Sequence, residues 1–285
     1  VTGVAFSPDG GQIVSASNDR TVRVWDVQTS AELAVFRSHG VSVTSVAFSP
    51  TGSRIASGDA DGLIRLWETA GAGELMVFRG HLGSVHSITF SADGSRIVSG
   101  AADHTVRVWN ATNGTELKVL LSHDGDVRSV AYSSDGSRIA SAVKCWIHVW
   151  DAASGDDLAV FYGHEALVTD VEFLADGMRI VSVSWDKTVR IWDVASGTEV
   201  AVLFGHKGRI DSVGLSGNGE RIVSGGGYGD KTSRVWDTAS GKELAAICGH
   251  DSGIHSVAFS PDGKWIVSGS GDRYGDYSVR LWTAT

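Results

Sequence analysis

Histidine, serine and aspartate recur together along the chain, and this combination of residues performs acyl transfer in serine hydrolases. In those enzymes the histidine removes a proton from the serine, and the aspartate holds the histidine in the required orientation. Two complete copies of the pattern, each closed by a tryptophan, consist of His81, Ser99, Asp103, Trp109, His164, Ser182, Asp186 and Trp192. A nucleophile is needed only once and lies in an exposed, strained turn, whereas these serines fall within expected strands. We therefore predict a structural role for the pattern and no catalytic residue in the chain.

A repeat of about 42 residues explains why the pattern recurs. Tryptophans mark the period at Trp25, Trp67, Trp109, Trp150, Trp192, Trp236 and Trp282. Histidines keep the same phase at His39, His81, His123, His164, His206 and His250. A period of about 40–45 residues with Gly-His and Trp-Asp marks is typical of one blade of a β-propeller.

Residues 41–81 show how one repeat is built. Segments that are β-branched or alternate in polarity predict four strands, over residues 41–49, 54–58, 63–67 and 74–79. The first two strands are separated by Ser-Pro-Thr-Gly, in which proline restricts φ and glycine can adopt a positive φ. No segment of the chain keeps a helical period. The sequence therefore predicts an all-β protein with four strands in each repeat.

Four-residue turns that end in glycine occur once in each repeat and so give the number of repeats. They are SPDG 7–10, SPTG 49–52, SADG 91–94, SSDG 133–136, LADG 174–177, SGNG 216–219 and SPDG 260–263. One small sheet cannot bury both of its faces, but neighbours stacked in a ring can bury them. We therefore predict that residues 1–285 form one domain, a seven-bladed β-propeller. Its blades are expected near residues 1–39, 40–81, 82–123, 124–164, 165–206, 207–250 and 251–285.

With seven phased copies of these marks, the chain resembles the WD-repeat (WD40) β-propellers over its full length. The strong similarity among its copies also resembles the tandem WD arrays attached to NACHT-type signalling ATPases in fungi and some bacteria. The resemblance implies that the histidine, serine, aspartate and tryptophan of a blade form one hydrogen-bond network that ties its strands together.

The resemblance also implies a strand that closes the ring. In WD-repeat propellers, a strand from the other terminus usually completes the last blade. This sequence opens with the innermost strand of the first blade and stops after the third strand of the seventh. We therefore expect the last blade to lack its outer strand in this chain, and residues outside the chain to supply it in the native protein. The missing initiator methionine likewise predicts a piece of a longer protein.

Composition argues against several functions. The net charge is −9 at pH 7 and no cluster of lysine and arginine stands out, so we predict no binding to nucleic acid. The chain shows neither a long apolar run nor a signal peptide, which predicts no membrane partner. Cys145 and Cys248 lack metal-ligand spacing and are expected to be reduced thiols in a cytoplasmic protein. We predict neither a metal nor a cofactor.

Aromatic residues that the repeat does not require gather in one class of turn, between the second and third strands of a blade. Every change in repeat length falls in this turn, and blade 4 carries Cys145 there in place of the expected aspartate. The resemblance places the turn on the rim called the top, where exposed aromatic residues are typical of binding surfaces. The alternative is drift in a decaying repeat, with the rings folded back on their own loops. The predicted binding rim over blades 4–7 consists of Trp146, Trp185, Tyr228, Tyr274, Tyr277 and Lys144.

A second variable position lies five residues after each Gly-His histidine, where the innermost strand begins. It holds Thr2, Thr44, His86, Arg128, Thr169, Asp211 and His255. Mixed charge near the mouth of the central channel predicts a selectivity surface, although tolerated variation near solvent explains it equally well. A histidine and a carboxylate could exchange protons there if they met, but His86 and His255 belong to blades across the ring.

Three functional hypotheses follow. The first is a scaffold or recognition module whose rim binds a protein or peptide partner. The second is a ligand-sensing domain of a larger NACHT-type ATPase, although this chain contains no G-x-x-x-x-G-K-[ST] motif itself. The third is a small-molecule binder or enzyme at the channel mouth, which a polar pocket joining Arg128, Asp211 and His255 would support.

Overall fold

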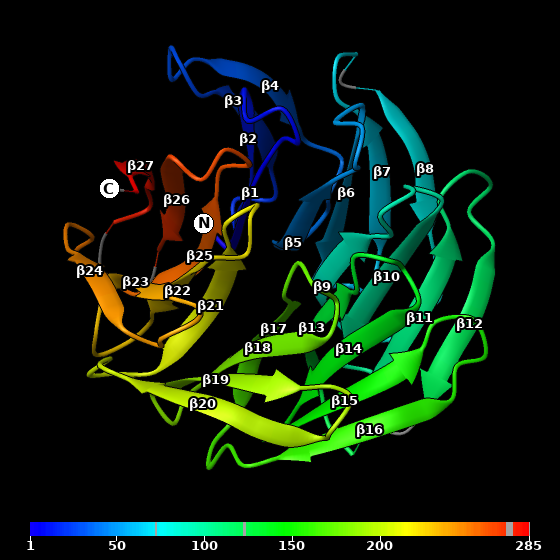
Figure 1. Ribbon diagram of the computed structural model, residues 1–285. Coiled ribbons are helices and arrows are strands. Elements are labelled where there is room, and N and C mark those ends of the chain that lie inside the picture. The colour runs from blue at the N-terminus through cyan, green and yellow to red at the C-terminus, as the bar shows by residue number, and fades with distance from the viewer. Residues whose placement is uncertain (72, 122–123, 272–275, 285) are drawn as a thin grey trace.

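A computed structural model describes residues 1–71, 73–121, 124–271 and 276–284. These residues form 27 strands and no helix, so no segment of them can cross a membrane as a helix. The strands make seven antiparallel sheets arranged around a central axis (Figure 1). This arrangement confirms the predicted all-β fold, a seven-bladed β-propeller.

The first four blades are four-stranded meanders in which each strand pairs with the next along the chain. Their strands are β1 (Gly3–Phe6), β2 (Gln12–Ala16), β3 (Val22–Asp26), β4 (Glu32–Phe36), β5 (Val43–Phe48), β6 (Arg54–Asp59), β7 (Ile64–Glu68), β8 (Glu74–Phe78), β9 (Val85–Phe90), β10 (Arg96–Ala101), β11 (Thr105–Asn110), β12 (Glu116–Leu121), β13 (Val127–Tyr132), β14 (Arg138–Val143), β15 (Trp146–Asp151) and β16 (Asp157–Tyr162).

Blades 5 and 6 repeat the meander, and the described residues of blade 7 form three strands, as predicted. These strands are β17 (Val168–Phe173), β18 (Arg179–Ser184), β19 (Thr188–Asp193), β20 (Thr198–Phe204), β21 (Ile210–Leu215), β22 (Arg221–Gly226), β23 (Ser233–Asp237), β24 (Glu243–Ile247), β25 (Ile254–Phe259), β26 (Trp265–Ser270) and β27 (Val279–Thr283).

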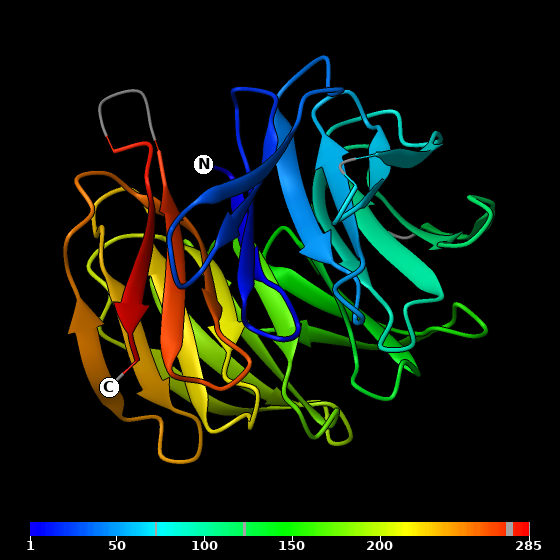
Figure 2. The ribbon, with the colours of Figure 1, turned by 90° about the horizontal axis from the view of Figure 1, so that it is seen from above.

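The ring closes where the first and last blades lie side by side, with the blue strands next to the red ones (Figures 1 and 2). The backbone N–H of Val4 donates to Ser256 Oγ at 3.0 Å, and the amino group of Val1 lies 3.3 Å from the Ser270 carbonyl oxygen. Val4 also packs in one apolar cluster with Val267 of β26. The closure therefore combines polar and apolar contacts across the junction.

The hydrophobic core is divided among the gaps between neighbouring blades. One cluster, for example, joins Val24 and Phe36 of blade 1 to Ile55 and Trp67 of blade 2. All four of these side chains are buried. Because each sheet is covered on both faces by its neighbours, a blade has no core of its own and depends on the ring.

A buried network holds the strands of five of the seven blades together. In blade 3, the Trp109 Nε1–H donates to Ser99 Oγ at 2.9 Å, and Ser99 Oγ lies 2.7 Å from His81 Nε2. His81 Nδ1 lies 2.9 Å from Asp103 Oδ2. Because the ionised Asp103 carboxylate can only accept, His81 Nδ1–H donates to it, and the neutral ring then accepts the serine hydroxyl at Nε2. Burial lowers the pKa of His81 even though Asp103 opposes that shift, which favours this neutral form.

The same four residue types make this network in blades 2, 5, 6 and 7. In blade 5, Trp192 Nε1 lies 2.8 Å from Ser182 Oγ, which lies 2.8 Å from His164 Nε2, and His164 Nδ1 lies 2.7 Å from Asp186. The Ser182 side chain is fully buried, like that of Ser99 in blade 3, so a substrate in solution cannot reach either hydroxyl.

The aspartate of the network also holds the loops of the top rim. Asp103 Oδ2 accepts a hydrogen bond from the Leu82 backbone N–H, and Asp103 Oδ1 accepts one from Thr105 N–H. Burial alone would raise the pKa of Asp103, but the hydrogen bonds from Leu82 N–H, the Thr105 hydroxyl and His81 hold it below its usual value. In blades 3, 5, 6 and 7 the buried network therefore also fixes a loop of the top rim.

We predict that Ser99→Ala lowers the free energy of unfolding by about 2–4 kcal/mol, because it leaves the buried Trp109 donor and His81 acceptor without their shared partner. Ser15→Ala in blade 1 is the matched control, since Ser15 accepts from Trp25 and has no histidine beside it among the described residues. It should cost about 1 kcal/mol. Urea denaturation midpoints measure both variants, and equal costs would contradict the role assigned to the histidine.

Candidate functional site

Bulges in the innermost strands direct the variable residues toward the channel. In six blades, the pairing between the first two strands skips one residue near the start of the innermost strand. The skipped residues are Thr44, His86, Arg128, Thr169, Asp211 and His255. A bulge leaves its extra residue unpaired and redirects the side chain. These six residues and Thr2 line one cavity of about 550 Å³ that follows the propeller axis.

Threonine at this position belongs to the framework of the ring. Thr169 Oγ1 donates to the Ile210 carbonyl oxygen at 2.8 Å, and Thr2 Oγ1 donates to the Val43 carbonyl oxygen at 2.6 Å. Thr44 makes the equivalent bond to blade 3. Each threonine thus ties its strand to the next blade, and chemical variation at the mouth is confined to the four ionisable residues.

Two of those ionisable residues, Asp211 and His255, meet in one cluster over blades 5–7. Asp211 Oδ2 lies 3.3 Å from His255 Nδ1, and Asp211 Oδ1 lies 3.1 Å from Arg209 Nε. The Trp185 Nε1–H donates to the same Oδ1 atom at 3.3 Å. The guanidinium carbon of Arg209 lies 5.0 Å from the centre of the Trp185 ring, a cation–π contact. The cluster therefore holds the partly exposed indole of Trp185 in one orientation.

The turn of blade 6 packs directly against this cluster. Gly227 is buried, and a Cβ atom at that position would overlap the Asp211 carboxylate. The backbone of Gly227 and Tyr228 also lies close to Gly253 of blade 7. These close approaches place Tyr228, whose side chain is 77% exposed, on the rim where blades 6 and 7 meet.

His86 and Arg128 belong to a second cluster, over blades 3 and 4. Asp126 Oδ2 lies 3.5 Å from Arg128 Nη2 and 3.7 Å from His86 Nε2, and Asp126 Oδ1 lies 3.7 Å from His104 Nε2. Burial and the charge of Arg128 lower the pKa of His86. Arg128 is paired here with Asp126, whereas Asp211 and His255 are paired with each other. Arg128, Asp211 and His255 thus line the same cavity but belong to two separate groups of contacts.

Trp146 and Lys144 lie on blade 4, away from the contacts of Trp185. The half-buried Trp146 ring meets Tyr162 of β16 edge-on, with ring centres 5.8 Å apart. The ammonium group of Lys144 lies 5.8 Å from the centre of the Trp146 ring. Trp146 therefore packs against the outer strand of its own blade, which agrees with the alternative that some rim aromatics fold back.

Blade 7 contributes one described tyrosine to the rim. Tyr277 is 69% exposed, and a Cβ atom on Gly271 would lie 3.0 Å from its ring. Tyr274, which the sequence also predicted as a rim residue, lies outside the described residues. The exposed aromatic residues described on this rim are thus Trp185, Tyr228 and Tyr277.

The channel also contains two carboxylates that were not predicted from the sequence, Asp170 and Glu172 of β17. Asp170 Oδ1 accepts a hydrogen bond from Ser129 Oγ at 2.7 Å, and its Oδ2 accepts one from Val213 N–H at 2.9 Å. Glu172 has neither a hydrogen bond nor an ion pair with another described residue. Burial, and secondly the charge of Asp170, raise the pKa of Glu172 to about 8. Aligning the seven repeats would have revealed both residues, because the other blades carry no acid at either position.

Comparison with protein families agrees with this architecture. Residues 1–162 match the family described as WDR90, 4th beta-propeller, and residues 155–193, 197–237 and 241–283 match the family described as WD domain, G-beta repeat. No curated protein matched the chain. The chain belongs to the WD-repeat β-propellers, which are generally non-catalytic scaffolds and typically mediate contacts between proteins. The resemblance to NACHT-type arrays stays a prediction.

We predict that Gly227→Ala lowers the free energy of unfolding by about 1–3 kcal/mol, because the added methyl group overlaps the Asp211 carboxylate. Gly40→Ala is the control, since a Cβ atom there meets nothing within 4 Å, and it should change stability by less than about 0.5 kcal/mol. The cost of Gly227→Ala should shrink when Asp211→Ala is also present. An unchanged cost in the double variant would contradict the contact.

We predict that Glu172→Gln becomes increasingly stabilising as the pH rises from 5 to 8. The folded protein holds a proton on Glu172, with a pKa of about 8, whereas the unfolded chain releases that proton near the ordinary glutamate pKa of 4.5. Glu172 therefore costs stability that grows through this interval, and glutamine removes the cost. The gain should reach about 1–3 kcal/mol at pH 8 in urea denaturation. Glu165→Gln, which changes an exposed carboxylate, should show no such trend.

Proposed function

We propose that this chain is a protein-interaction module that binds a protein or peptide segment on its top rim, with Trp185 as the main anchor. The proposal rests on the fixed indole of Trp185, which is 42% exposed although Asp211 and Arg209 both hold it. Aromatic side chains that are already ordered before binding lose little entropy on association and often dominate binding energy.

The neighbourhood of Trp185 supports a macromolecular partner. Tyr228 and Tyr277 add exposed rings on the two following blades. Lys187 and Lys207 are exposed on the loops of blades 5 and 6, so the aromatic residues have a polar surround. An apolar centre with a polar edge is the usual composition of a protein interface. The proposed binding surface extends along the rim to Trp146 and Lys144 of blade 4.

The resemblance to NACHT-type arrays extends this proposal. If the chain is part of such a protein, the same rim would sense the ligand that activates the ATPase. A G-x-x-x-x-G-K-[ST] motif encoded elsewhere in the same gene would support this form of the proposal.

A second candidate function is the recognition of a small molecule at the mouth. The pair of Asp211 and His255 favours it, because a histidine beside a carboxylate can exchange protons with a bound ligand. The serines of the histidine–serine–aspartate–tryptophan networks are buried and cannot serve as a nucleophile for such a ligand. Binding of small polar ligands that is lost in His255→Ala but kept in Trp185→Ala would favour this function over the first.

We predict that Trp185→Ala weakens capture of the partner by at least about tenfold, because alanine removes the anchor and its contact with Arg209. Trp265→Ala is the matched control: Trp265 is similarly exposed, at 37%, but starts β26 beside the turn 260–263. Proteins retained from source lysate by the immobilised chain should be quantified for the wild type and both variants after equal thermal stability is shown.

Equal retention of the partner by the wild type and both variants would contradict the assignment of the binding site to the rim. Loss in Trp265→Ala alone would move the site to the opposite end of the blades. A further variant, Trp146→Ala, measures how far the site reaches: a loss there would extend the contact to blade 4, and unchanged capture would limit it to blades 5–7.

A further inference from the structure

A belt of serine side chains surrounds the channel just beyond the mouth. It consists of Ser45, Ser87, Ser129, Ser212 and Ser256, with Asp170 at the equivalent position of blade 5. Four of these hydroxyls accept hydrogen bonds from the innermost strand of the neighbouring blade, as Ser87 Oγ does from Val130 N–H at 3.1 Å and Ser212 Oγ from Val257 N–H at 3.2 Å. The wall of the channel at this level is therefore polar and held by the backbone.

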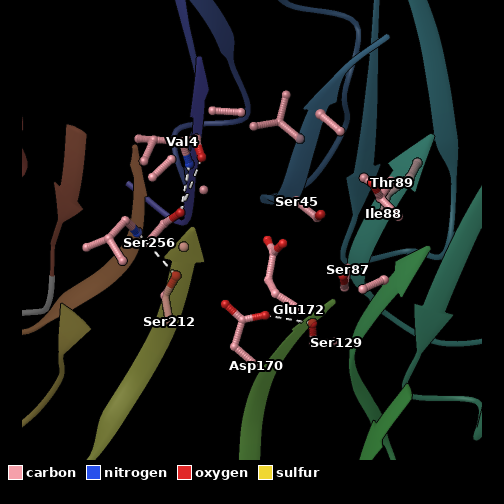
Figure 3. Close-up of a pocket in the computed structure, with 18 of the residues that line it drawn as sticks. Val4, Ser45, Ser87, Ile88, Thr89, Ser129, Asp170, Glu172, Ser212 and Ser256 are labelled. Carbon is pink, nitrogen blue, oxygen red and sulfur yellow. Dashed lines mark hydrogen bonds between the residues drawn. The ribbon is translucent and has the colours of Figure 1, made fainter. Parts of the chain in front are cut away.

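Glu172 lies two residues further along β17, at a level where the other blades carry small side chains. The equivalent residues are Ala5, Ala47, Thr89, Ala131, Gly214 and Ala258. Glu172 is half-buried and lines the channel cavity. Figure 3 shows the carboxylate pointing toward the middle of the channel. The small residues around it leave room for a bound group.

The Glu172 carboxylate, without a partner at this level of the channel, favours a bound cation. Asp170 is engaged by Ser129 and Val213, but Glu172 has no partner among the described residues. A half-buried carboxylate without a partner is costly unless it is neutralised by a proton or a positive charge. The cavity of about 550 Å³ falls within the size range of ligand pockets.

An organic ammonium group fits the part of the channel around Glu172 better than a metal ion does. Among the described residues, no group of three or more histidine, cysteine, aspartate or glutamate side chains could hold a metal. Calcium and magnesium need several oxygen ligands, whereas an ammonium group needs about three acceptors. Glu172 and the serine hydroxyls offer such acceptors, and the alanines at the level of Glu172 provide an apolar wall for an alkyl chain.

We propose that the central channel binds an alkylammonium group, with the Glu172 carboxylate as its counter-ion and serine hydroxyls of the belt as further acceptors. This site is separate from the rim around Trp185 and does not depend on the function proposed there. The ammonium group can come from a free amine or from a lysine side chain of a partner, since both present the same alkyl chain and charge.

Binding should release a proton. The raised pKa of Glu172 means that the empty site holds a proton near neutral pH, and an ammonium group would displace it. Affinity should therefore increase as the pH rises from about 6 to 8. Other titratable groups line the same cavity and must be considered in the pH profile: His86, Arg128, Tyr132, Asp170, Asp211 and His255.

Isothermal titration calorimetry of the whole chain with pentylamine tests the site, with 1-pentanol as the uncharged control. Two buffers of different ionisation enthalpy, neither a primary amine, report the proton released. We expect pentylamine to bind with proton release and pentanol not to bind. Glu172→Gln should weaken binding by at least about tenfold, whereas Glu165→Gln, at an exposed position, should leave it unchanged. The urea midpoint of Glu172→Gln shows that this variant is folded.

The peptide acetyl-Ala-Lys-Ala-amide distinguishes the two sources of the ammonium group. Tighter binding of the peptide than of pentylamine assigns the site to a lysine of a partner, and binding of pentylamine alone assigns it to a free amine. Binding that survives in Glu172→Gln, equal binding of pentanol, or no binding of either amine would overturn the proposal.

Discussion

The structure depends on one buried hydroxyl in each of blades 2, 3, 5, 6 and 7, the serine that lies between a tryptophan and a histidine. In blade 3, Ser99 accepts from Trp109 of the third strand and contacts His81 of the loop that enters the blade. The hydroxyl thus joins three segments that are far apart in the repeat, and the attached aspartate carries the connection up to the rim. Because unsatisfied buried polar groups are costly, the network specifies a single arrangement of these segments. The same atoms that resemble a catalytic triad therefore serve to hold the loops.

The fold could be predicted because the same pattern of residues recurs seven times in the sequence. The spacing of tryptophans and of turn glycines determines the number of blades, and strand alternation determines the number of strands in each. The bulges that turn Arg128 and Asp211 toward the channel could not be predicted, since a single skipped residue leaves no mark in the composition. Nor could sequence reasoning tell that Trp146 contacts its own outer strand while Trp185 contacts the neighbouring blade, because both occupy the same class of turn.

Charge is distributed unevenly over this molecule in a way that its net value conceals. At the mouth, carboxylates are compensated: Asp126 lies beside Arg128, and Asp211 lies beside Arg209 and His255. Inside the channel, Glu172 is left without a compensating charge among the described residues, and burial and then the charge of Asp170 raise its pKa. Surface charges are screened by salt within about 10 Å, whereas an enclosed charge is screened far less. The interior of the ring is therefore electrostatically distinct from its rim.

The serine belt also bears on how interchangeable the blades are. A joint in which a backbone N–H meets a serine hydroxyl, as at Ser87 and Ser212, can be formed by any copy of the repeat placed next to any other. Blade 5 breaks this equivalence with Asp170, and blade 1 breaks it with Gly3 at the corresponding position. A ring of similar units thereby has two positions that differ from the rest. These two positions give an otherwise nearly symmetric molecule a defined orientation about its axis. Loss of blade 1 or blade 5 would therefore not be equivalent to loss of another blade.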